Sequence, residues 1–466
     1  LLSMSSFCFM LYSPKYFWLI ALVTVLAYGI GRALETAKNK SHGLRKTILI
    51  IGIIITATAL IITKYSDFSI TTLNRIVGLL GSSLQLPLLK FVMPIGISFW
   101  TFQTIAYIAD VYLGKTEAEK NLLYFSASVI FFPIVTMGPI TRVQDLVPQL
   151  SRKYTFDYER MRSGLLLMLW GYFKKLMIAD RLAVFVGTVF GNVHNYSGKV
   201  NGLMFLVAGV FYAIQLYTDF SGYTDIVRGS ARIFGIDLPL NFTAPYFARS
   251  VAEFWRRWHM TLMDWLKNYV YIPLGGNRKG KVRKYFNIMA VFFVSGLWHG
   301  AGFTYIFWGL LNGFYQLAGS FLKPFNDWVV RTLKIDRESS GHKFFQTIFT
   351  FLLITIAWMF FRANSLSDAI YMVERMFMPT IWIFTDGTMA QQGLTATEIM
   401  IALLSIGVVW VVDYLKFERK VDILTWLTTQ HLLFRWLVYY SLIFVIVIFG
   451  HYGGTYNAAD FVYFKF

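Results

Sequence analysis

Few residues in this chain can move protons near neutral pH, because it has only seven histidines in 466 residues. One of them, His299, ends an apolar stretch within Ser295–Gly300 (Ser-Gly-Leu-Trp-His-Gly). It lies about 15 residues beyond Lys284, or roughly 22 Å along a helix, inside a hydrocarbon core of about 30 Å. An ionisable group at that depth is costly and is by default a functional candidate. The alternative is a buried neutral imidazole bonded to a neighbouring helix, and these residues alone do not separate the two interpretations.

A second histidine, His259, stands among tryptophan and arginine residues. The spacing within 253–262 predicts a helix on which Glu253 meets Arg257 and Trp255 shares a face with His259. An amphipathic helix at the membrane surface explains most of these residues. His259 is the exception, because an imidazole among tryptophans can line a cavity.

Two acidic residues follow an aromatic run, Asp219 and Asp225, with Arg228 one helical turn beyond the second. Paired charges at the end of a span usually serve folding, so the structural interpretation carries more weight here.

The glycine-rich run 275–282 nearly spells a nucleotide-binding P-loop. Val282 stands where a serine or threonine would hold Mg²⁺, and no strand precedes the run, so nucleotide hydrolysis is rejected. Its basic residues, Arg278 and Lys279 among them, suit anionic lipid headgroups or the phosphates of a cytosolic donor such as coenzyme A. The headgroup interpretation is the simpler one.

The sequence lacks the motifs of several common classes of enzyme. The chain has no H-E-x-x-H, C-x-x-C or G-x-S-x-G sequence and no dinucleotide-binding fingerprint. The single cysteine, Cys8, excludes an internal disulfide framework and a cysteine-cluster metal site. We therefore expect no metal site and no tightly bound cofactor.

The composition indicates where such residues must be positioned. Hydrophobic residues make up 56% of the chain and charged residues 15%, against about 25% charged in soluble domains. A chain this apolar is neither disordered nor an ordinary soluble enzyme. Aromatic residues, at 18%, fit interfacial belts, and the net charge of +18 fits basic cytoplasmic loops better than a nucleic-acid partner.

Apolar runs long enough to cross a bilayer, roughly 20 residues each, recur along the sequence. The candidates are 13–31, 47–63, 86–109, 121–141, 163–190, 202–220, 285–300, 303–322, 345–362, 396–414 and 434–450. All are typical of helix, so we predict one all-α polytopic membrane domain over 1–466. Lys174 and Lys175 fall inside a candidate span, and snorkelling to the interface is the simplest account of them.

Lysine and arginine orient these spans. Four stretches rich in these residues are expected on the cytoplasmic side: 32–46, 249–284, 323–343 and 415–420. The loop 363–395 has one basic residue and is expected outside, as is the tail 451–466. Because both flanks of 285–322 are cytoplasmic, this segment must be a helical pair, broken at Gly300–Gly302. The same reasoning favours a re-entrant 121–141.

Six short motifs, spread over nearly the whole chain, resemble those of the membrane-bound O-acyltransferase family. The nearest branch is the bacterial alginate and peptidoglycan O-acetylation proteins, and the teichoic-acid D-alanylation acyltransferase is more distant. Each motif alone is weakly specific, but the set is highly specific. The motifs are Pro94–Phe99, Gly138–Arg142, Asp219–Asp225, Phe254–His259, Tyr271–Arg278 and Leu297–Gly300.

The resemblance implies an MBOAT-type bundle of about 10–12 transmembrane or re-entrant helices around a central tunnel, with His299 at its centre. It maps the family's second histidine onto His259 and implies a further span before Leu1. Asp264 departs from the family pattern, which has a serine there. We take further residues as candidates for lining the tunnel or its cytoplasmic opening: Trp298, Trp255, Asp219, Asp225, Arg278 and Lys279.

The leading hypothesis is an O-acyltransferase of the bacterial cytoplasmic membrane. It would carry an acetyl group from acetyl-CoA, or another cytoplasmic acyl thioester, to the outer face, with His299 as general base. Without a serine-hydrolase signature in the chain, final transfer to a cell-wall or secreted polysaccharide would need an SGNH-hydrolase-like partner outside. The alternatives are D-alanyl transfer from a carrier protein for teichoic acid and a non-catalytic transporter or scaffold. A transporter usually shows inverted repeats, which the sequence lacks.

The tail Phe461–Phe466 holds Tyr463 among aromatic residues, which usually anchor at the interface. It also resembles the ending of proteins in the acetylation branch. A thiol has a pKa near 8.5, a phenol near 10 and water near 15.7, so a tyrosyl ester lies between a thioester and a sugar ester in acyl-transfer potential. We therefore expect Tyr463 to be a transient acyl carrier.

Overall fold

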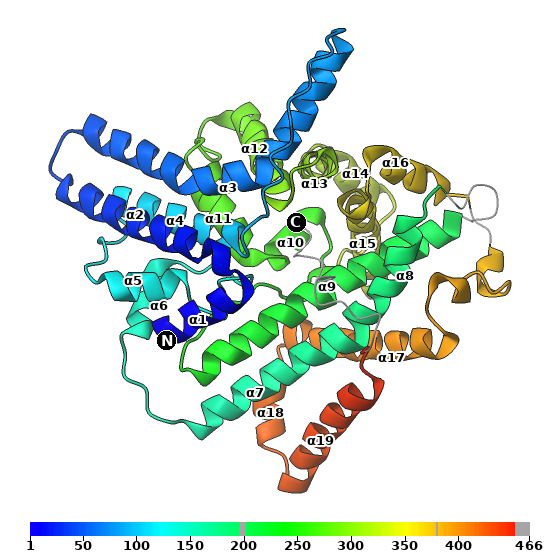
Figure 1. Cartoon of the computed structure of the whole chain (residues 1–466). Coiled ribbons are helices and arrows are strands. Elements are labelled where there is room, and N and C mark those ends of the chain that lie inside the picture. The colour runs from blue at the N-terminus through cyan, green and yellow to red at the C-terminus, as the bar shows by residue number, and fades with distance from the viewer. Residues whose placement is uncertain (195–201, 379–380, 453–466) are drawn as a thin grey trace. The chain divides into compact units, whose positions relative to one another are not determined.

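The computed structural model describes residues 1–194, 202–378 and 381–452, and these residues form helices without strands (Figure 1). The all-α prediction is confirmed. Tyr463 and the rest of the tail from 453 lie outside the described residues. Within the described ranges, six helical segments are long and apolar enough to cross a membrane: Pro14–Thr36, His42–Leu79, Gly202–Ile233, Ser340–Arg362, Ala396–Glu418 and Leu432–Phe449.

The chain divides into two compact units. Unit 1 comprises Leu1–Met161, Ser230–Pro239 and Asp264–Tyr269, and unit 2 comprises Arg162–Gly229, Leu240–Met263 and Val270–Phe466. The principal helices that begin in unit 1 are α1 (Leu2–Tyr12), α2 (Phe17–Thr36), α3 (His42–Leu79), α4 (Ile97–Tyr112), α5 (Leu122–Val129), α6 (Val143–Leu150) and α7 (Tyr158–Tyr172).

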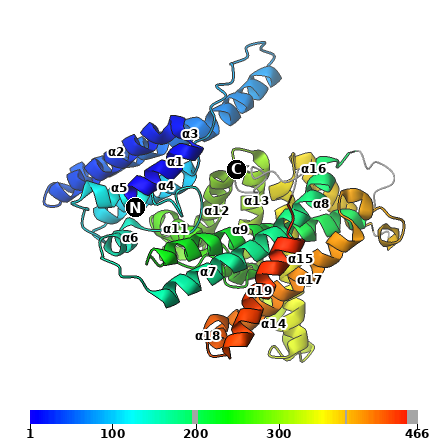
Figure 2. The same cartoon turned by 60° about the horizontal axis from the view of Figure 1, so that its bottom comes forward.

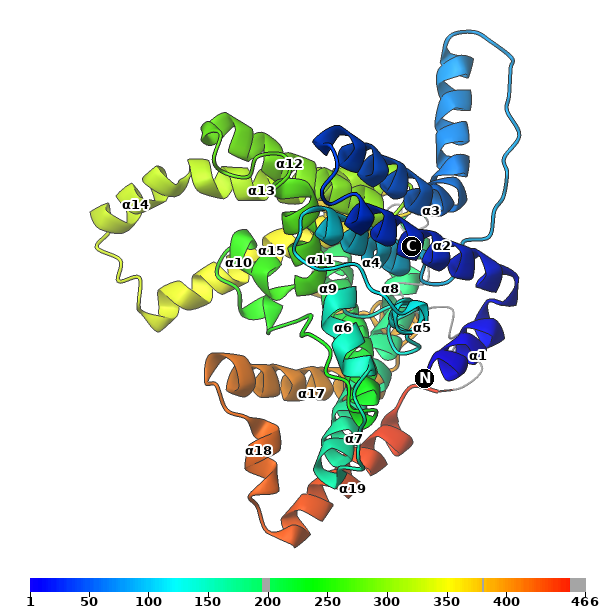
Figure 3. The ribbon, with the colours of Figure 1, turned by 90° about the vertical axis from the view of Figure 1, so that its left-hand side faces the viewer.

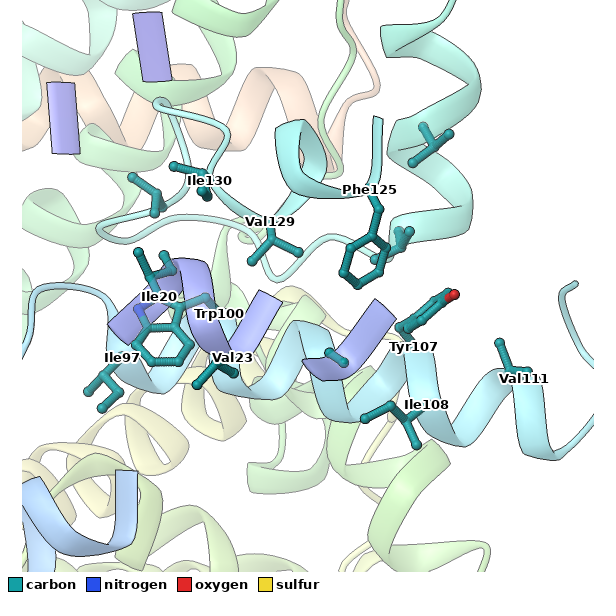
Figure 4. Close-up of a cluster of buried hydrophobic side chains, with 14 of the residues drawn as sticks. Ile20, Val23, Ile97, Trp100, Tyr107, Ile108, Val111, Phe125, Val129 and Ile130 are labelled. Atoms are coloured by element: carbon teal, nitrogen blue, oxygen red, sulfur yellow. The ribbon is translucent and has the colours of Figure 1, made fainter. Parts of the chain in front are cut away.

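The core of unit 1 lies between α2, α4 and α5. Trp100 and Tyr107 project from α4 toward apolar residues of α2 and toward Phe125 (Figure 4). Gly31 of α2 is required for this contact, because a Cβ there would lie 2.5 Å from the Tyr107 ring. The buried Tyr107 hydroxyl accepts a hydrogen bond from the amide of Glu119 at 3.1 Å, which satisfies the polar end of the ring.

Helix α3 is much longer than the predicted span 47–63. It continues unbroken for 38 residues, about 57 Å. The chain then returns beside α3 in irregular conformation (Figure 3), where Asn74 and Asp67 accept hydrogen bonds from the amides of Leu86 and Leu89. The span predicted at 86–109 is therefore wrong in its first part. Pro87 and Pro94 disfavour helix there, and α4 begins only at Ile97.

Two other predicted spans are interrupted. In 121–141 only α5, eight residues long, is a regular helix. In 163–190, α7 passes through the π-helix η2 (Phe173–Ala179) into α8 (Asp180–Gly191). Pro133 and the Gly138–Pro139 pair disfavour helix after α5, whereas nothing comparable in the local sequence marks the π-helix η2.

Unit 2 carries the remaining helices. They are α9 (Gly202–Ile233), α10 (Val251–Arg257), α11 (Met260–Leu266), α12 (Gly280–His299), α13 (Phe303–Phe321), α14 (Lys323–Thr332), α15 (Ser340–Arg362), α16 (Leu366–Arg375), α17 (Ala396–Asp413), α18 (Ile423–Thr428) and α19 (Leu432–Phe449). The π-helix η7 (Tyr414–Glu418) extends α17. Five predicted spans correspond to membrane-length helices whose ends are shifted: 13–31, 202–220, 345–362, 396–414 and 434–450.

Helices α12 and α13 form a close hairpin, broken at 300–302 as the topology argument predicts. Glycines make the close approach possible. A Cβ at Gly296 would lie 2.4 Å from the carbonyl oxygen of Tyr305, and one at Gly309 would lie 2.3 Å from that of Phe292. This hairpin fixes the end of α12, where His299 stands.

Candidate active site

His299 is the last residue of α12 and is 3% exposed. Its ring lies between two aromatic rings from different helices, with centroids 5.1 Å from Trp308 and 5.2 Å from Phe361. Gly300 follows it, and a Cβ at that position would meet the Tyr305 ring at 2.2 Å. The packing of α12, α13 and α15 therefore holds this imidazole in place.

His259 lies at a break that the sequence did not reveal. The helix expected over 253–262 is wrong: α10 ends at Arg257, Trp258 is extended, and His259 has a φ of +42° before α11 starts. A left-handed conformation at a residue other than glycine costs of the order of 1–3 kcal/mol and clusters at functional sites. The predicted Glu253–Arg257 pair does form, at 2.7 Å.

Hydrogen bonding defines the tautomer of His259. Nδ1 lies 3.2 Å from the side-chain oxygen of Asn241, which also accepts hydrogen bonds from the amide and hydroxyl of Thr261. Because that oxygen can only accept, Nδ1 carries the proton and Nε2 of the neutral ring presents a lone pair. Nε2 is buried and has no hydrogen-bond partner among the described residues. His259 lies outside the six candidate spans, and burial lowers the pKa of its imidazole to about 3, so the ring is neutral.

The two histidines, 40 positions apart in sequence, meet in space with ring centroids 6.5 Å apart. Aromatic rings close around them, with Phe220 at 4.8 Å and Trp298 at 5.8 Å from His259. Both imidazoles are buried, so charge that develops here is stabilised or penalised more strongly than in solution. Two fixed imidazoles in a dry aromatic setting can accept, hold and return a proton.

Trp255 supports this arrangement from the side. Its indole nitrogen donates to the side-chain oxygen of Asn312 at 3.1 Å, which ties α10 to α13. Its ring also meets Trp308, 5.7 Å away between centroids. This residue is buried, and the contact connects the packing around His259 with the packing around His299.

The two aspartates have other partners. Asp219 accepts from Lys175 at 2.7 Å, and Asp225 accepts from Lys174 at 2.6 Å. The snorkelling account of the two lysines is therefore wrong: the side chain of Lys174 is only 5% exposed and points into unit 2. The π-helix η2 places these adjacent lysines against α9, where paired charges avoid the penalty for burying a single one.

The remaining candidates lie apart from the histidine pair. Arg278 and Lys279 stand exposed in the turn before α12. Within unit 1, Asp264 pairs with Arg142 at 2.5 Å, and Tyr269 donates to the buried carboxylate of Asp110 at 2.7 Å. Asp264, the departure from the family pattern, thus forms an ion pair with a residue of another motif. Tyr463 lies outside the described residues.

Sequence reasoning missed four residues of the site. Asn241 orients His259, and Asn312 holds Trp255, while Trp308 and Phe361 enclose His299. Nothing in the spacing around Asn241 marks it, because its partner is 18 residues away across a turn. Trp308 and Phe361 look like ordinary residues of apolar helices.

Comparisons with known proteins identify the family of this chain. A model of the membrane-bound O-acyltransferase family matches residues 118–327, which include both histidines. A probable alginate O-acetylase (AlgI) of Pseudomonas putida is 36% identical over 402 residues, covering 86% of this chain and 79% of the relative. A peptidoglycan O-acetyltransferase of Helicobacter pylori is 35% identical, and the match covers 80% of this chain and 72% of the relative's length. A teichoic acid D-alanyltransferase of Bacillus subtilis is 30% identical, over 50% of this chain and 60% of its own.

Proposed function

The chain belongs to the membrane-bound O-acyltransferase family and is a membrane-embedded O-acyltransferase, and from this premise we propose that it carries an acetyl group across the bacterial cytoplasmic membrane. The donor is a cytoplasmic thioester, acetyl-CoA, and the acetyl group leaves on the outer face for O-acetylation of a cell-wall or secreted polysaccharide. The observation that carries the proposal is the pair of buried imidazoles, His259 and His299, 6.5 Å apart between ring centroids.

Acyl transfer at this pair needs one proton to move twice. His299 takes the proton of an attacking hydroxyl as the oxygen adds to the thioester carbonyl. The carbon–sulfur bond then breaks, and the proton goes to the departing thiolate, which leaves as coenzyme A. General base catalysis by a placed histidine contributes roughly 10²–10⁴-fold in rate. His259, neutral and held by Asn241, lies beside His299 and keeps the surroundings of that base fixed while the proton moves.

Tyr463 is the proposed first acceptor, and its phenol ester then passes the acetyl group to an outer partner of the SGNH-hydrolase type. The C-terminal tail lies outside in this proposal, which follows from the basic loops of the chain. From Gly450 to Tyr463 the chain can extend about 44 Å, enough to reach back toward the middle of the membrane. The names of the relatives, which modify alginate and peptidoglycan, support a polysaccharide as the final acceptor.

Arg278 and Lys279 are proposed to meet the phosphates of coenzyme A at the cytoplasmic opening. Both are exposed, and the turn that holds them leads directly into α12, which ends at His299. D-alanyl transfer is the second candidate. The match to the D-alanyltransferase relative covers half of the chain, whereas the matches to the alginate and peptidoglycan acetylases described above cover 86% and 80%, which favours acetyl.

The test uses inverted membrane vesicles that contain the full chain, supplied with acetyl-CoA labelled in its acetyl group. Wild-type protein should acquire label, and Tyr463→Phe should not, while His299→Ala should slow loading at least a hundredfold. The control is His342→Ala, a histidine near the start of α15 and away from the pair. Label in wild type and in His299→Ala at equal rates would remove His299 from the mechanism. Transfer from a D-alanyl carrier protein but not from acetyl-CoA would establish the second candidate instead.

A further inference from the structure

An apolar cavity of about 560 Å³ lies within unit 2, apart from the histidine pair. Four helices line it: α7 contributes Leu167 and Trp170, α17 contributes Val412, α18 contributes Leu427 and α19 contributes Leu442. Its volume lies within the range of roughly 300–1,000 Å³ that is usual for small-molecule sites. None of its lining residues belongs to the proposed acetyl-transfer machinery.

Contacts near both ends attach α19 to the rest of unit 2. At its C-terminal end, the amide of His451 donates to the carbonyl of Leu176, and the guanidinium of Arg181 donates to the carbonyl of Phe449. At its N-terminal end, Phe434 meets Trp426 of α18, with ring centroids 6.1 Å apart. Figure 2 shows α19 leading away from α18. Between the two attachments α19 leaves the space open.

Water is a poor occupant of this space. A buried water needs two to four polar partners, and the wall is almost wholly made of leucine, isoleucine, valine and aromatic side chains. An apolar void also costs free energy in proportion to its volume. Helices α17 and α19 are both candidate membrane spans, so hydrocarbon is the solvent at hand.

The polar groups of the wall are unevenly placed. Lys416 lines the cavity from η7, near the end of the span Ala396–Glu418, and Asp422 lines it directly before α18, so both lie at the end of the spans α17 and α19 where α18 joins them. Both side chains are exposed, and no ion pair joins them in the described part of the chain. Hydrogen bonds from the hydroxyl and amide of Thr425 hold the pKa of Asp422 below its ordinary value, so this carboxylate is ionised.

One hydroxyl deeper in the wall lacks a partner. Tyr439 lines the cavity from α19, about 10 Å along the helix from its start at Leu432. Its hydroxyl oxygen is buried, and no described residue bonds to it. A buried hydroxyl without a partner costs free energy. The cavity thus offers a cation and an anion at one end, a hydroxyl donor below them, and hydrocarbon walls beyond.

We propose that this cavity binds one molecule of a membrane phospholipid with an ethanolamine headgroup. The acyl chains fill the apolar space, the phosphate lies by Lys416, the ammonium lies by Asp422, and Tyr439 donates to an ester carbonyl of the glycerol. This order of groups, from charge through ester to hydrocarbon, is the order of a phospholipid from the interface inward. The lipid fixes the middle of α19, which the protein itself leaves unsupported.

The test is retention and rebinding of lipid by the full chain purified in a non-ionic detergent. Native mass spectrometry should show one phosphatidylethanolamine retained per chain. After delipidation, dioleoyl-phosphatidylethanolamine should rebind and raise the unfolding temperature, and dioleoyl-phosphatidylglycerol, which lacks the ammonium, should bind at least tenfold more weakly. Equal affinity for the two lipids, or no retained lipid in wild type, would overturn the proposal.

Matched variants locate the site. Val412→Trp fills the cavity and should lower lipid occupancy at least tenfold, whereas Val411→Trp, on the exposed side of the same helix, should not. Tyr439→Phe should weaken binding severalfold, with Tyr440→Phe, its exposed neighbour, as the control. If Val412→Trp does not fold, the comparison of Tyr439→Phe with Tyr440→Phe still tests the site, because neither of these variants adds volume. Equal occupancy in both members of each pair would place the lipid elsewhere.

Discussion

At the scale of single residues, the decisive feature is the bond that fixes the ring of His259. Asn241 accepts from Nδ1, and this leaves Nε2 as the acceptor in a pocket of aromatic rings. A histidine that titrated freely in water would sample both tautomers. Here the side-chain oxygen of Asn241 can only accept, so the proton stays on Nδ1 of His259. The proposed chemistry at Nε2 therefore depends on an asparagine that is remote from the histidine in sequence.

Asn241→Ala tests this dependence. The variant should fold and enter the membrane, but acetyl transfer should fall roughly 10–100-fold, the range seen when a histidine loses the group that orients it. Initial rates of label transfer in vesicles give the measurement. The exposed Asn326→Ala serves as the matched control. Unchanged transfer in Asn241→Ala would mean that the hydrogen bond serves the fold only.

Lys174 and Asp225 make a second argument at this scale. Their ion pair is 2.6 Å long, and the lysine side chain is 5% exposed. Removing one partner of a buried pair costs up to about 3–5 kcal/mol, whereas replacing both by apolar residues costs less. Asp225 keeps Arg228 at 3.8 Å, so the loss here is expected to fall below that range. Lys174→Met should therefore lower the unfolding temperature more than the double variant Lys174→Met/Asp225→Leu. The opposite ranking would show that the attraction between Lys174 and Asp225 does not offset the cost of burying them.

At the scale of elements, the α12–α13 hairpin positions His299. The two helices approach closely because Gly296 and Gly309 present no side chain to the opposing backbone. In a membrane, where lipid tails are as apolar as leucine, such close backbone contact is a main source of helix association. The position of His299 is therefore set by Gly296, one turn before it on α12, and by Gly309 on α13, and not by the histidine's own contacts alone.

Gly296→Ala should disturb this hairpin. The new Cβ would lie 2.4 Å from the Tyr305 carbonyl oxygen, so the backbone must move, at a cost of about 1–3 kcal/mol. We expect a lower unfolding temperature and slower acetyl transfer together. Gly319→Ala on α13 is the matched control, because its Cβ would meet nothing within 4 Å. A Gly296→Ala enzyme as stable and as fast as this control would contradict the role given to the hairpin.

At the scale of the whole molecule, the length of α3 bears on topology. At about 57 Å it is nearly twice the thickness of a hydrocarbon core of about 30 Å, so a large part of α3 lies outside the membrane or along its surface. From the distribution of basic residues we expect Asn39 on the cytoplasmic side of the membrane and Ser83 on the outer side. Both positions are exposed, which makes them suitable for labelling.

Single cysteines test this orientation. In a Cys8→Ala background, Ser83→Cys should react with a membrane-impermeant maleimide added to intact cells, and Asn39→Cys should react only in inverted vesicles. The chain has no other cysteine that could contribute signal. Labelling of both positions from the same side would show that α3 does not cross the membrane.

Sequence alone determined the features that rest on local pattern. Long apolar runs predicted α2, α9, α15, α17 and α19, because a run of about 20 apolar residues has few other stable states. Gly300–Gly302 predicted the break between α12 and α13, and short motifs marked His259 and His299. Each of these patterns lies within one helical turn or one membrane span of the feature that it predicts.

Only the tertiary structure decided which distant residues meet. No local pattern predicted that the helix would break at His259, that Asn241 would bond to its ring, or that Lys174 would pair with Asp225 instead of reaching the interface. Each of these depends on burial, which is set by elements far along the chain. A polar group removed from water must find a partner, and packing, not spacing, decides which partner is within reach.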